Sequence, residues 1–198
     1  MNVYLDGDFA FGIAQIVGAW LQVGEELDEE KAHQLIRADA FETAMQKALN
    51  YLSYCPRSLK DVHDSLVAKE YDEEIIIQVL ERLQQGGYVE DRNFARIWVE
   101  NRNTFRPRSR RMLAVELKHK GVAEEIINET LAEQTDDEKA AYDAASRYAR
   151  RLMGLDWLMF RDRLGAFLIR RGFSYGTSAS VVRMVWDECH SDGDSTEL

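Results

Sequence analysis

The residues that most often perform chemistry in proteins are sparse and scattered in this chain. The histidines stand far apart, and the His-Glu-x-x-His pattern, which places two zinc ligands on one helix face, does not occur. The glycine pair Gly86-Gly87 is not followed by the Lys-Ser or Lys-Thr of a phosphate-binding loop. The sequence therefore predicts a protein that is not an enzyme and that uses no cofactor. The four histidines are His33, His63, His119 and His190.

The two cysteines, Cys55 and Cys189, are too few and too far apart for a disulfide scaffold or a zinc ribbon. His190 follows Cys189 directly, but two ligands without two more do not make a zinc site, so we expect no metal. No partner base for the Cys55 thiol can be identified in the sequence. We therefore interpret Cys55 as a partly buried structural residue and not as a reactive thiol.

Arginines form the one dense cluster of chemically active side chains. Five of them lie within residues 102–111, which contain no acidic residue. A guanidinium group matches carboxylates and phosphates through two parallel hydrogen bonds, and clustered like charges repel one another unless an anionic partner is present. Two interpretations stay open: a contact surface for acidic side chains or DNA phosphates, and a solvated loop paired with nearby glutamates. The candidate binding residues are Arg102, Arg106, Arg108, Arg110 and Arg111, with Arg92, Arg96, Lys118 and Lys120 flanking them.

A second group of arginines lies between residues 147 and 171 and is mixed with Asp156 and Asp162. Ion pairs on a protein surface contribute little to stability or binding. We therefore interpret this group as ordinary surface. Its members are Arg147, Arg150, Arg151, Arg161, Arg163, Arg170 and Arg171.

The composition indicates an ordinary globular protein of 198 residues, with 45% apolar and 30% charged residues. A formal net charge of −10 argues against a general nucleic-acid coat, although one local basic face could still bind DNA. The longest uncharged stretch, Phe9 to Val23, is too short to span a bilayer. We expect a soluble, cytoplasmic, monomeric protein without a membrane segment.

The first 40 residues differ from the rest of the chain. Asp6-Gly7 between two apolar runs predicts a β-hairpin, and a short helix is expected from Ile13 to about Leu21. The acidic run 25–30 indicates the start of another short helix, and Trp20 is expected to pack this extension against the first helical unit. From Asp39 onward the pattern is helical. In a capping box, the N-cap side chain and the side chain three residues later each accept a hydrogen bond from the other residue's backbone N–H. Such boxes are predicted at Asp39–Glu42, Ser58–Asp61 and Thr135–Glu138.

A repeat with a period of 51 residues organises the helical part. Pro56-Arg57-Ser58 returns as Pro107-Arg108-Ser109, so that both prolines of the chain lie in one repeated tripeptide. Further positions match across three copies, although Glu70 breaks a column that holds glycine in the other two. The matching columns are Val62, Leu113 and Leu164; Leu66, Leu117 and Leu168; Lys69, Lys120 and Arg171; and Tyr71, Val122 and Phe173.

These columns predict an all-α core built as an elongated tandem array of three three-helix units. The expected boundaries are an N-terminal extension over 1–40, repeats over 41–88, 89–134 and 135–190, and a disordered tail over 191–198. Apolar residues at helical spacing are expected in the core. These are Phe94, Ala95, Leu117, Leu168 and Phe173, with Trp98, Trp157 and Trp186.

The repeats resemble the bacterial RecX family of regulatory proteins. The resemblance covers about 42–188 and is most specific where Asp91 to Arg96 combines with Glu116 to Gly121. Cys55 and Glu70 depart from the family pattern. The matching stretches are Ala48–Leu52 running into Arg57-Ser58, Tyr88–Arg96, Glu116–Val122 and Arg170–Phe173.

The resemblance implies a non-enzymatic regulator that lies on the RecA recombinase filament on DNA. Such a protein limits filament growth or promotes disassembly, and so restrains ATP hydrolysis, strand exchange and the SOS co-protease activity. By this interpretation the partner is the RecA filament, and the arginine cluster is the part of the chain that could also contact DNA. The double substitution Arg106→Glu with Arg108→Glu is then expected to weaken binding while leaving the fold unchanged.

Two alternatives stay open from the residues alone. A helix-turn-helix DNA-binding regulator would also consist of three-helix units, but its third helices over 72–83 and 124–131 are acidic, and only the helix after Pro107 suits a major groove. A hydrolase or transferase without a recognisable motif would need a deep polar pocket.

Overall fold

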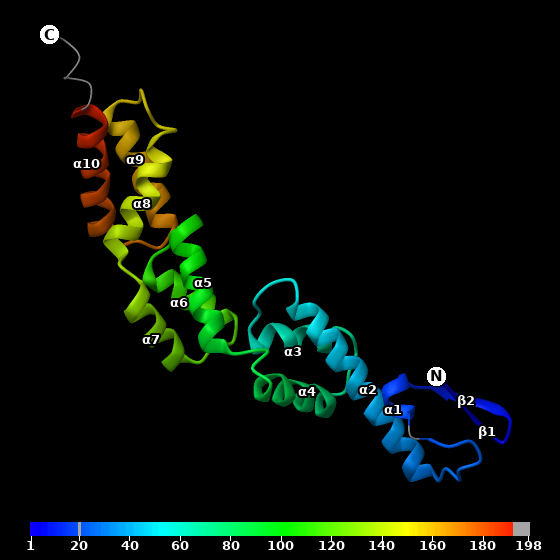
Figure 1. The fold of residues 1–198 in the computed structure, drawn as a ribbon. Helices are drawn as coiled ribbons and strands as arrows, with labels where there is room; N and C mark the ends of the chain where they lie inside the picture. The colour runs from blue at the N-terminus through cyan, green and yellow to red at the C-terminus, as the bar shows by residue number, and fades with distance from the viewer. Residues whose placement is uncertain (20, 192–198) are drawn as a thin grey trace. The chain divides into compact units, whose positions relative to one another are not determined.

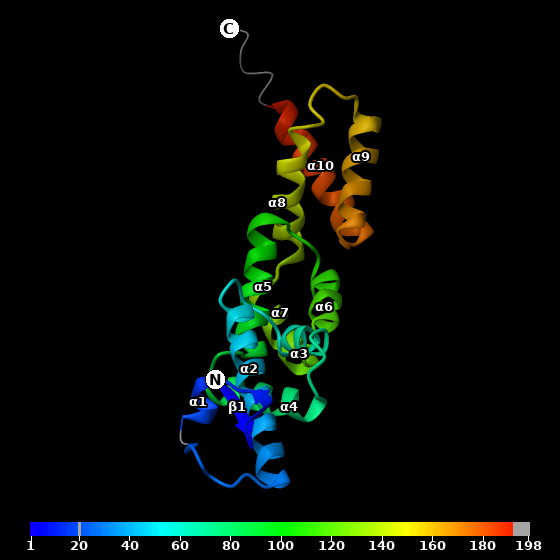
Figure 2. The ribbon, with the colours of Figure 1, turned by 90° about the vertical axis from the view of Figure 1, so that its right-hand side faces the viewer.

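The computed structural model describes residues 1–19 and 21–191, which form ten helices and a two-stranded sheet (Figures 1 and 2). The chain divides into two compact units, one over residues 1–90 and one that begins at Asp91. Trp20 and most of the 191–198 tail lie outside the described residues. The packing expected of Trp20 and the disorder expected of the tail therefore fall outside them too.

The N-terminal hairpin forms as predicted. Strands β1 (Asn2–Leu5) and β2 (Asp8–Gly12) pair antiparallel, with Leu5 opposite Asp8. The connecting residues Asp6 and Gly7 both have positive φ, 52° and 96°, as a tight two-residue hairpin turn requires. Helix α1 is only Gln15–Gly18, shorter than expected. A small core of Val3, Ile13, Val17 and Leu35 joins the hairpin and α1 to the next helix.

Helix α2 runs without a break over Glu29–Leu52, so the predicted capping box at Asp39–Glu42 is wrong. The helix begins at the Asp28 cap, whose carboxylate accepts a hydrogen bond from the Lys31 N–H. Asp39 lies in the middle of the helix, and its Oδ1 accepts from the Ala14 N–H at 2.5 Å. The acidic run therefore leads into one long helix and not a short one, and the boundary expected after residue 40 falls inside α2.

The first repeat combines the second half of α2 with α3 (Leu59–Val67) and α4 (Glu73–Gln85). The capping box at Ser58 and Asp61 is present as predicted, and Ser58 is fully buried. No single short helix can bury its apolar stripe alone, so the three pack together. The core contains Ala44, Ala48, Val62, Leu66, Ile75, Ile76, Val79, Leu83 and Val89.

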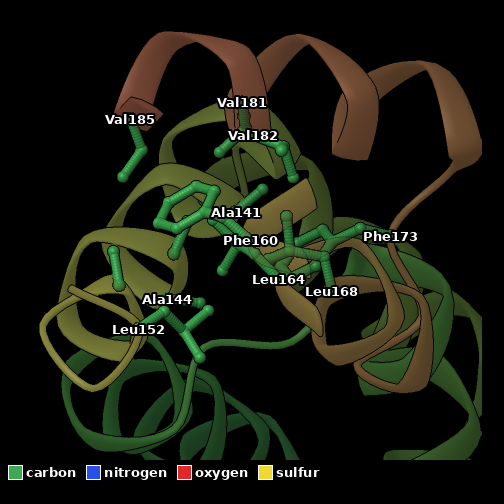
Figure 3. Packing of buried hydrophobic residues seen from close by; sticks show 12 residues of the cluster. Ala141, Ala144, Leu152, Phe160, Leu164, Leu168, Phe173, Val181, Val182 and Val185 are labelled. Carbon is green, nitrogen blue, oxygen red and sulfur yellow. The ribbon is translucent and has the colours of Figure 1, made fainter. Parts of the chain in front are cut away.

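The second unit holds two further repeats. The second repeat consists of α5 (Asp91–Phe105), α6 (Arg110–His119) and α7 (Glu124–Gln134). The third consists of α8 (Asp137–Ala149), α9 (Trp157–Arg170) and α10 (Tyr175–Ser191), which pack against one another. In Figure 3, buried residues of α8, α9 and α10 gather into one core. The cap of α8 is Asp136 and not the predicted Thr135, whose hydroxyl instead donates to the Leu131 carbonyl oxygen.

The repeated columns mark one helix ending used three times. After α3, α6 and α9, a residue with positive φ turns the chain: Glu70 (63°), Gly121 (77°) and Gly172 (92°). The next N–H then donates back to the carbonyl oxygen five residues earlier, from Tyr71 to Leu66 and equivalently from Val122 and Phe173. This is the Schellman ending, in which an apolar residue after the turn packs on the helix. The 51-residue period thus corresponds to one repeated backbone conformation.

The predicted core residues are confirmed. Phe94, Ala95, Leu117, Leu168 and Phe173 are each at most 4% exposed. Trp98, Trp157 and Trp186 are half-buried and pack against the cores of their own repeats. The interpretation of Cys55 as partly buried is wrong, because Cys55 is exposed in the turn that follows α2.

Glu70 is the one member of this column that carries a side chain, and in the left-handed region its β-carbon is strained. We expect Glu70→Gly to raise the free energy of unfolding of the first repeat by about 0.5–1 kcal/mol, measured by urea denaturation. The control is Glu70→Ala, which removes the carboxylate but keeps the β-carbon and should change stability by less than about 0.5 kcal/mol. Equal stabilisation by both substitutions would show that the charge, and not the backbone, matters here.

Candidate functional site

The arginine cluster lies at the turn between α5 and α6, which we call the basic turn (residues 106–111). Pro107 and Ser109 are buried, and the Ser109 hydroxyl caps α6 by accepting from the Met112 N–H at 3.3 Å. Two backbone bonds fasten the turn to the third repeat. The Ser109 N–H donates to the Arg171 carbonyl oxygen at 3.1 Å, and the Arg110 N–H donates to Asp137 Oδ1 at 2.7 Å. The basic turn is therefore held in place by residues from the following repeat.

Two arginines of the third repeat complete this attachment. Arg147 donates to the Thr104 carbonyl oxygen at 2.6 Å, and Arg171 donates to the Pro107 carbonyl oxygen at 2.8 Å. The Arg171 guanidinium also lies 4.5 Å from the centre of the Phe167 ring. The interpretation of Arg147 and Arg171 as ordinary surface is therefore wrong. Their role depends on contacts between repeats, and the only sequence signal was the basic column that Arg171 shares with Lys69 and Lys120.

Positive charge is concentrated where the two repeats meet. Burial lowers the pKa of Arg171 from its usual range, and the neighbouring charges of Arg108, Arg106 and Arg147 lower it further. The guanidinium groups of Arg106, Arg108 and Arg147 thus each lie close enough to repel that of Arg171. The arrangement favours an anion placed beside them.

Part of the cluster is neutralised within the protein. Glu116 of α6 is 13% exposed and pairs with Arg102 at 2.8 Å and with Arg108 at 2.5 Å. Its Oε2 also accepts from the Trp98 indole N–H at 2.8 Å, and the Arg102 guanidinium stacks on the Trp98 ring. Arg102 and Arg108 therefore have a structural role in the second repeat. Charge reversal at Arg108 would place a carboxylate beside Glu116, so Arg108 is unsuited to a test that must preserve the fold.

The other predicted residues divide into two groups. Arg92 pairs with Glu129, Arg96 donates to Asn93 at 3.1 Å, and Lys120 lies 5.5 Å from the centre of the Trp98 ring. The second group is exposed, and its side chains have no ion pair or hydrogen bond to any described residue. It consists of Arg106, Arg110, Arg111 and Lys118.

The start of α6 adds a further preference for anions. Its first turn contains Arg110 and Arg111 and no acidic residue, so positive side chains lie at the positive end of the helix dipole. The Asp137 carboxylate offsets this positive charge only at the Arg110 N–H. Arg111 and Lys118, two helical turns apart, lie on the same side of α6.

Within residues 1–19 and 21–191, no three His, Cys, Asp or Glu side chains gather into a metal site. Near the end of α10, the His190 ring stacks on Trp186, and its Nδ1 lies 2.9 Å from the Trp186 carbonyl oxygen. In the same part of the chain, no helix is long and apolar enough to cross a membrane.

Family comparisons match all three repeats. Models of the first, second and third RecX three-helix domains match residues 44–83, 91–131 and 136–182. The chain belongs to the RecX family. Curated relatives named Regulatory protein RecX include one from Leuconostoc citreum, 32% identical over 91% of this chain and 70% of that protein, and one from Streptomyces lividans, 35% identical over 80% and 84%.

Solved structures agree with this assignment. A crystal structure of regulatory protein RecX covers 94% of both chains with a TM-score of 0.72 at 27% identity. RecX from Lactobacillus salivarius has a TM-score of 0.63 at 24% identity, over 75% of this chain and 97% of that one, and shows the fold alone. The three-helix repeats deduced from the sequence are thus RecX domains.

The Glu116 network predicts an asymmetry between two similar substitutions. Glu116→Gln removes the charge that two arginines share in a largely buried site, and should lower the free energy of unfolding by about 1–3 kcal/mol, measured by urea denaturation with Trp fluorescence. The matched control is Glu129→Gln on α7, whose partner Arg92 is well exposed, and it should cost less than about 0.5 kcal/mol. Equal costs would mean that Glu116 does not organise the second repeat.

Proposed function

We propose that this RecX-family chain binds the RecA recombinase filament on DNA and restrains it. The bound chain limits filament growth, and with it ATP hydrolysis, strand exchange and the SOS co-protease activity. The observation that carries the proposal is the match of three consecutive RecX three-helix domains to the three repeats. The proposal places the chain in the cytoplasm, where it acts as a monomer.

The basic turn is the proposed contact surface. Its exposed arginines lie beside further positive charge from the third repeat, at a helix N-terminus without acidic residues. Such a surface fits carboxylates of the filament, or the phosphates of its DNA. We assign direct contact to Arg106, Arg110, Arg111 and Lys118, and a supporting role to Arg92, Arg96, Arg102, Arg108 and Lys120, whose side chains already have partners within the chain.

The direct test adds the purified chain to RecA assembled on single-stranded DNA. We expect ATP turnover and mean filament length to fall as the chain is added, with saturation at a fixed ratio of chain to filament. Unchanged turnover, filament length and strand exchange at saturating chain would overturn the proposal.

A helix-turn-helix DNA-binding regulator is the second candidate, favoured only by the basic start of α6. In a three-helix reader of this type the recognition helix would need to face phosphates and bases. The third helix α7 instead carries Glu124, Glu125, Glu129 and Glu133. Site-selective, salt-dependent binding to bare DNA without binding to the recombinase would establish this candidate in place of the first.

The structure changes the choice of substitution for the basic turn. Arg106→Glu with Arg111→Glu reverses two exposed charges without affecting Glu116, so the melting temperature should stay within about 2 °C of the wild type. Affinity for the filament should fall at least about tenfold at low salt, and the difference should shrink as salt screens the charges. Co-sedimentation with filaments over a salt series measures both effects.

The control is Arg150→Glu with Arg151→Glu, which makes the same charge change at two exposed residues after α8. This control should bind within about twofold of wild type. If both double variants weaken binding equally, net charge is responsible and the basic turn is not a specific contact.

A further inference from the structure

A groove of about 550 Å³ lies between α9 and α10 in the third repeat. Its walls are mainly apolar and include Trp157, Ile169, Tyr175 and Val182. Tyr175 is 82% exposed and Ile169 46% exposed, although both are large apolar residues. The groove belongs to neither the basic turn nor the contacts that hold it.

The other two repeats fill the equivalent position. Helices α4, α7 and α10 begin at Glu73, Glu124 and Tyr175, in step with the 51-residue period. Three residues further on lie Ile76, Ile127 and Ser178. Both isoleucines are buried in their repeat cores, at 0% and 4% exposure. The third repeat therefore has a small hydroxyl where its sister repeats have a large core side chain.

At a second position, too, the third repeat has a smaller residue than the first. In the first repeat, His63 of α3 lies across from Glu73 of α4, with Nε2 and Oε1 3.1 Å apart. The equivalents in the third repeat are Gly165 and Tyr175, which make no such bridge. A β-carbon added at Gly165 would meet no atom within 4 Å. The third repeat thus lacks a contact between α9 and α10 like the one that joins α3 to α4 in the first repeat.

Ser178 also has an unmet bonding requirement. The residue is 2% exposed and lines the groove, and its Oγ has no hydrogen-bond partner among the described residues. A buried hydroxyl without a partner costs free energy that an isoleucine would not. The third repeat bears this cost at a position where its sister repeats avoid it.

The rim of the groove carries excess positive charge. Arg161 pairs with the adjacent Asp162 at 2.8 Å. Arg183 of α10 is exposed, and no described residue forms an ion pair with it. An incoming carboxylate can therefore pair with Arg183 without displacing an existing contact.

We propose that the α9–α10 groove is a docking site for a protein segment that inserts one large apolar side chain flanked by carboxylates. The side chain lies in the groove beside Ser178, against its apolar walls, and a flanking carboxylate pairs with Arg183. The size and apolar lining of the groove suit one such anchor residue.

The test titrates N-acetyl-Asp-Phe-Asp-amide into the full-length, ¹⁵N-labelled chain to about 5 mM, a range suited to the weak affinity of a single anchor. We expect saturable amide shifts at groove residues of α9 and α10. N-acetyl-Asp-Ala-Asp-amide, which lacks the anchor, and N-acetyl-Lys-Phe-Lys-amide, which reverses the charges, should produce shifts at least about fivefold smaller.

Ser178→Ile restores the residue of the other repeats. It should abolish the shifts while leaving the melting temperature equal to or above that of the wild type, which separates loss of binding from loss of fold. Ser180→Ile makes the same replacement at an exposed position two residues away and should bind normally. Arg183→Glu should weaken peptide binding, and Arg183→Lys should retain most of it.

Absence of shifts in the wild type, or equal shifts in Ser178→Ile, would overturn the inference. Peptide binding by a wild-type chain that does not bind RecA filaments would support the groove and overturn the proposed function. The two proposals can therefore fail separately.

Discussion

The hydrogen bonds from Arg147 and Arg171 to the carbonyl oxygens of Thr104 and Pro107 are the interaction on which the proposed contact surface depends. Like charges concentrated in one turn repel one another, and these bonds to backbone oxygens oppose that repulsion. These bonds fix the turn, but they also bring two more positive charges to it. The pKa of Arg171 is lowered first by its burial and then by the charges of Arg108, Arg106 and Arg147. The third repeat thus increases both the order and the charge of a surface that belongs to the second.

The three repeats share a scaffold and differ at the positions proposed to act. Each uses the same helix ending, with a positive-φ residue and a bond back to a core leucine, so the spacing of elements is preserved. Around that constant frame, the first repeat joins α3 to α4 through His63 and Glu73, the second presents the basic turn, and the third has a groove that Ser178 helps to line. A duplicated unit whose stability comes from local packing can accept such changes in one copy without disturbing the others.

Much of the fold could be predicted because its signals are local. The Asp6-Gly7 turn, the Ser58 cap and the repeated helix endings all depend on contacts between residues close together in the sequence. The continuation of α2 through Asp39 could not be predicted, because Asp39 bonds Ala14, which is distant in sequence. For the same reason, the sequence could not separate Arg102 and Arg108, which pair with Glu116, from the exposed Arg106 and Arg111. It located the cluster, but which arginines remain free depends on tertiary partners.

Hydrogen exchange of the wild-type chain, with and without RecA filaments on single-stranded DNA, tests the central claim most directly, because it reports where the chain is covered. The account predicts slower exchange in peptides that span the basic turn and the start of α6, while α4 in the first repeat exchanges as in the free chain. Saturating filaments that protect the first repeat and leave residues 106–119 unchanged would contradict it, as would exchange that no amount of filament alters.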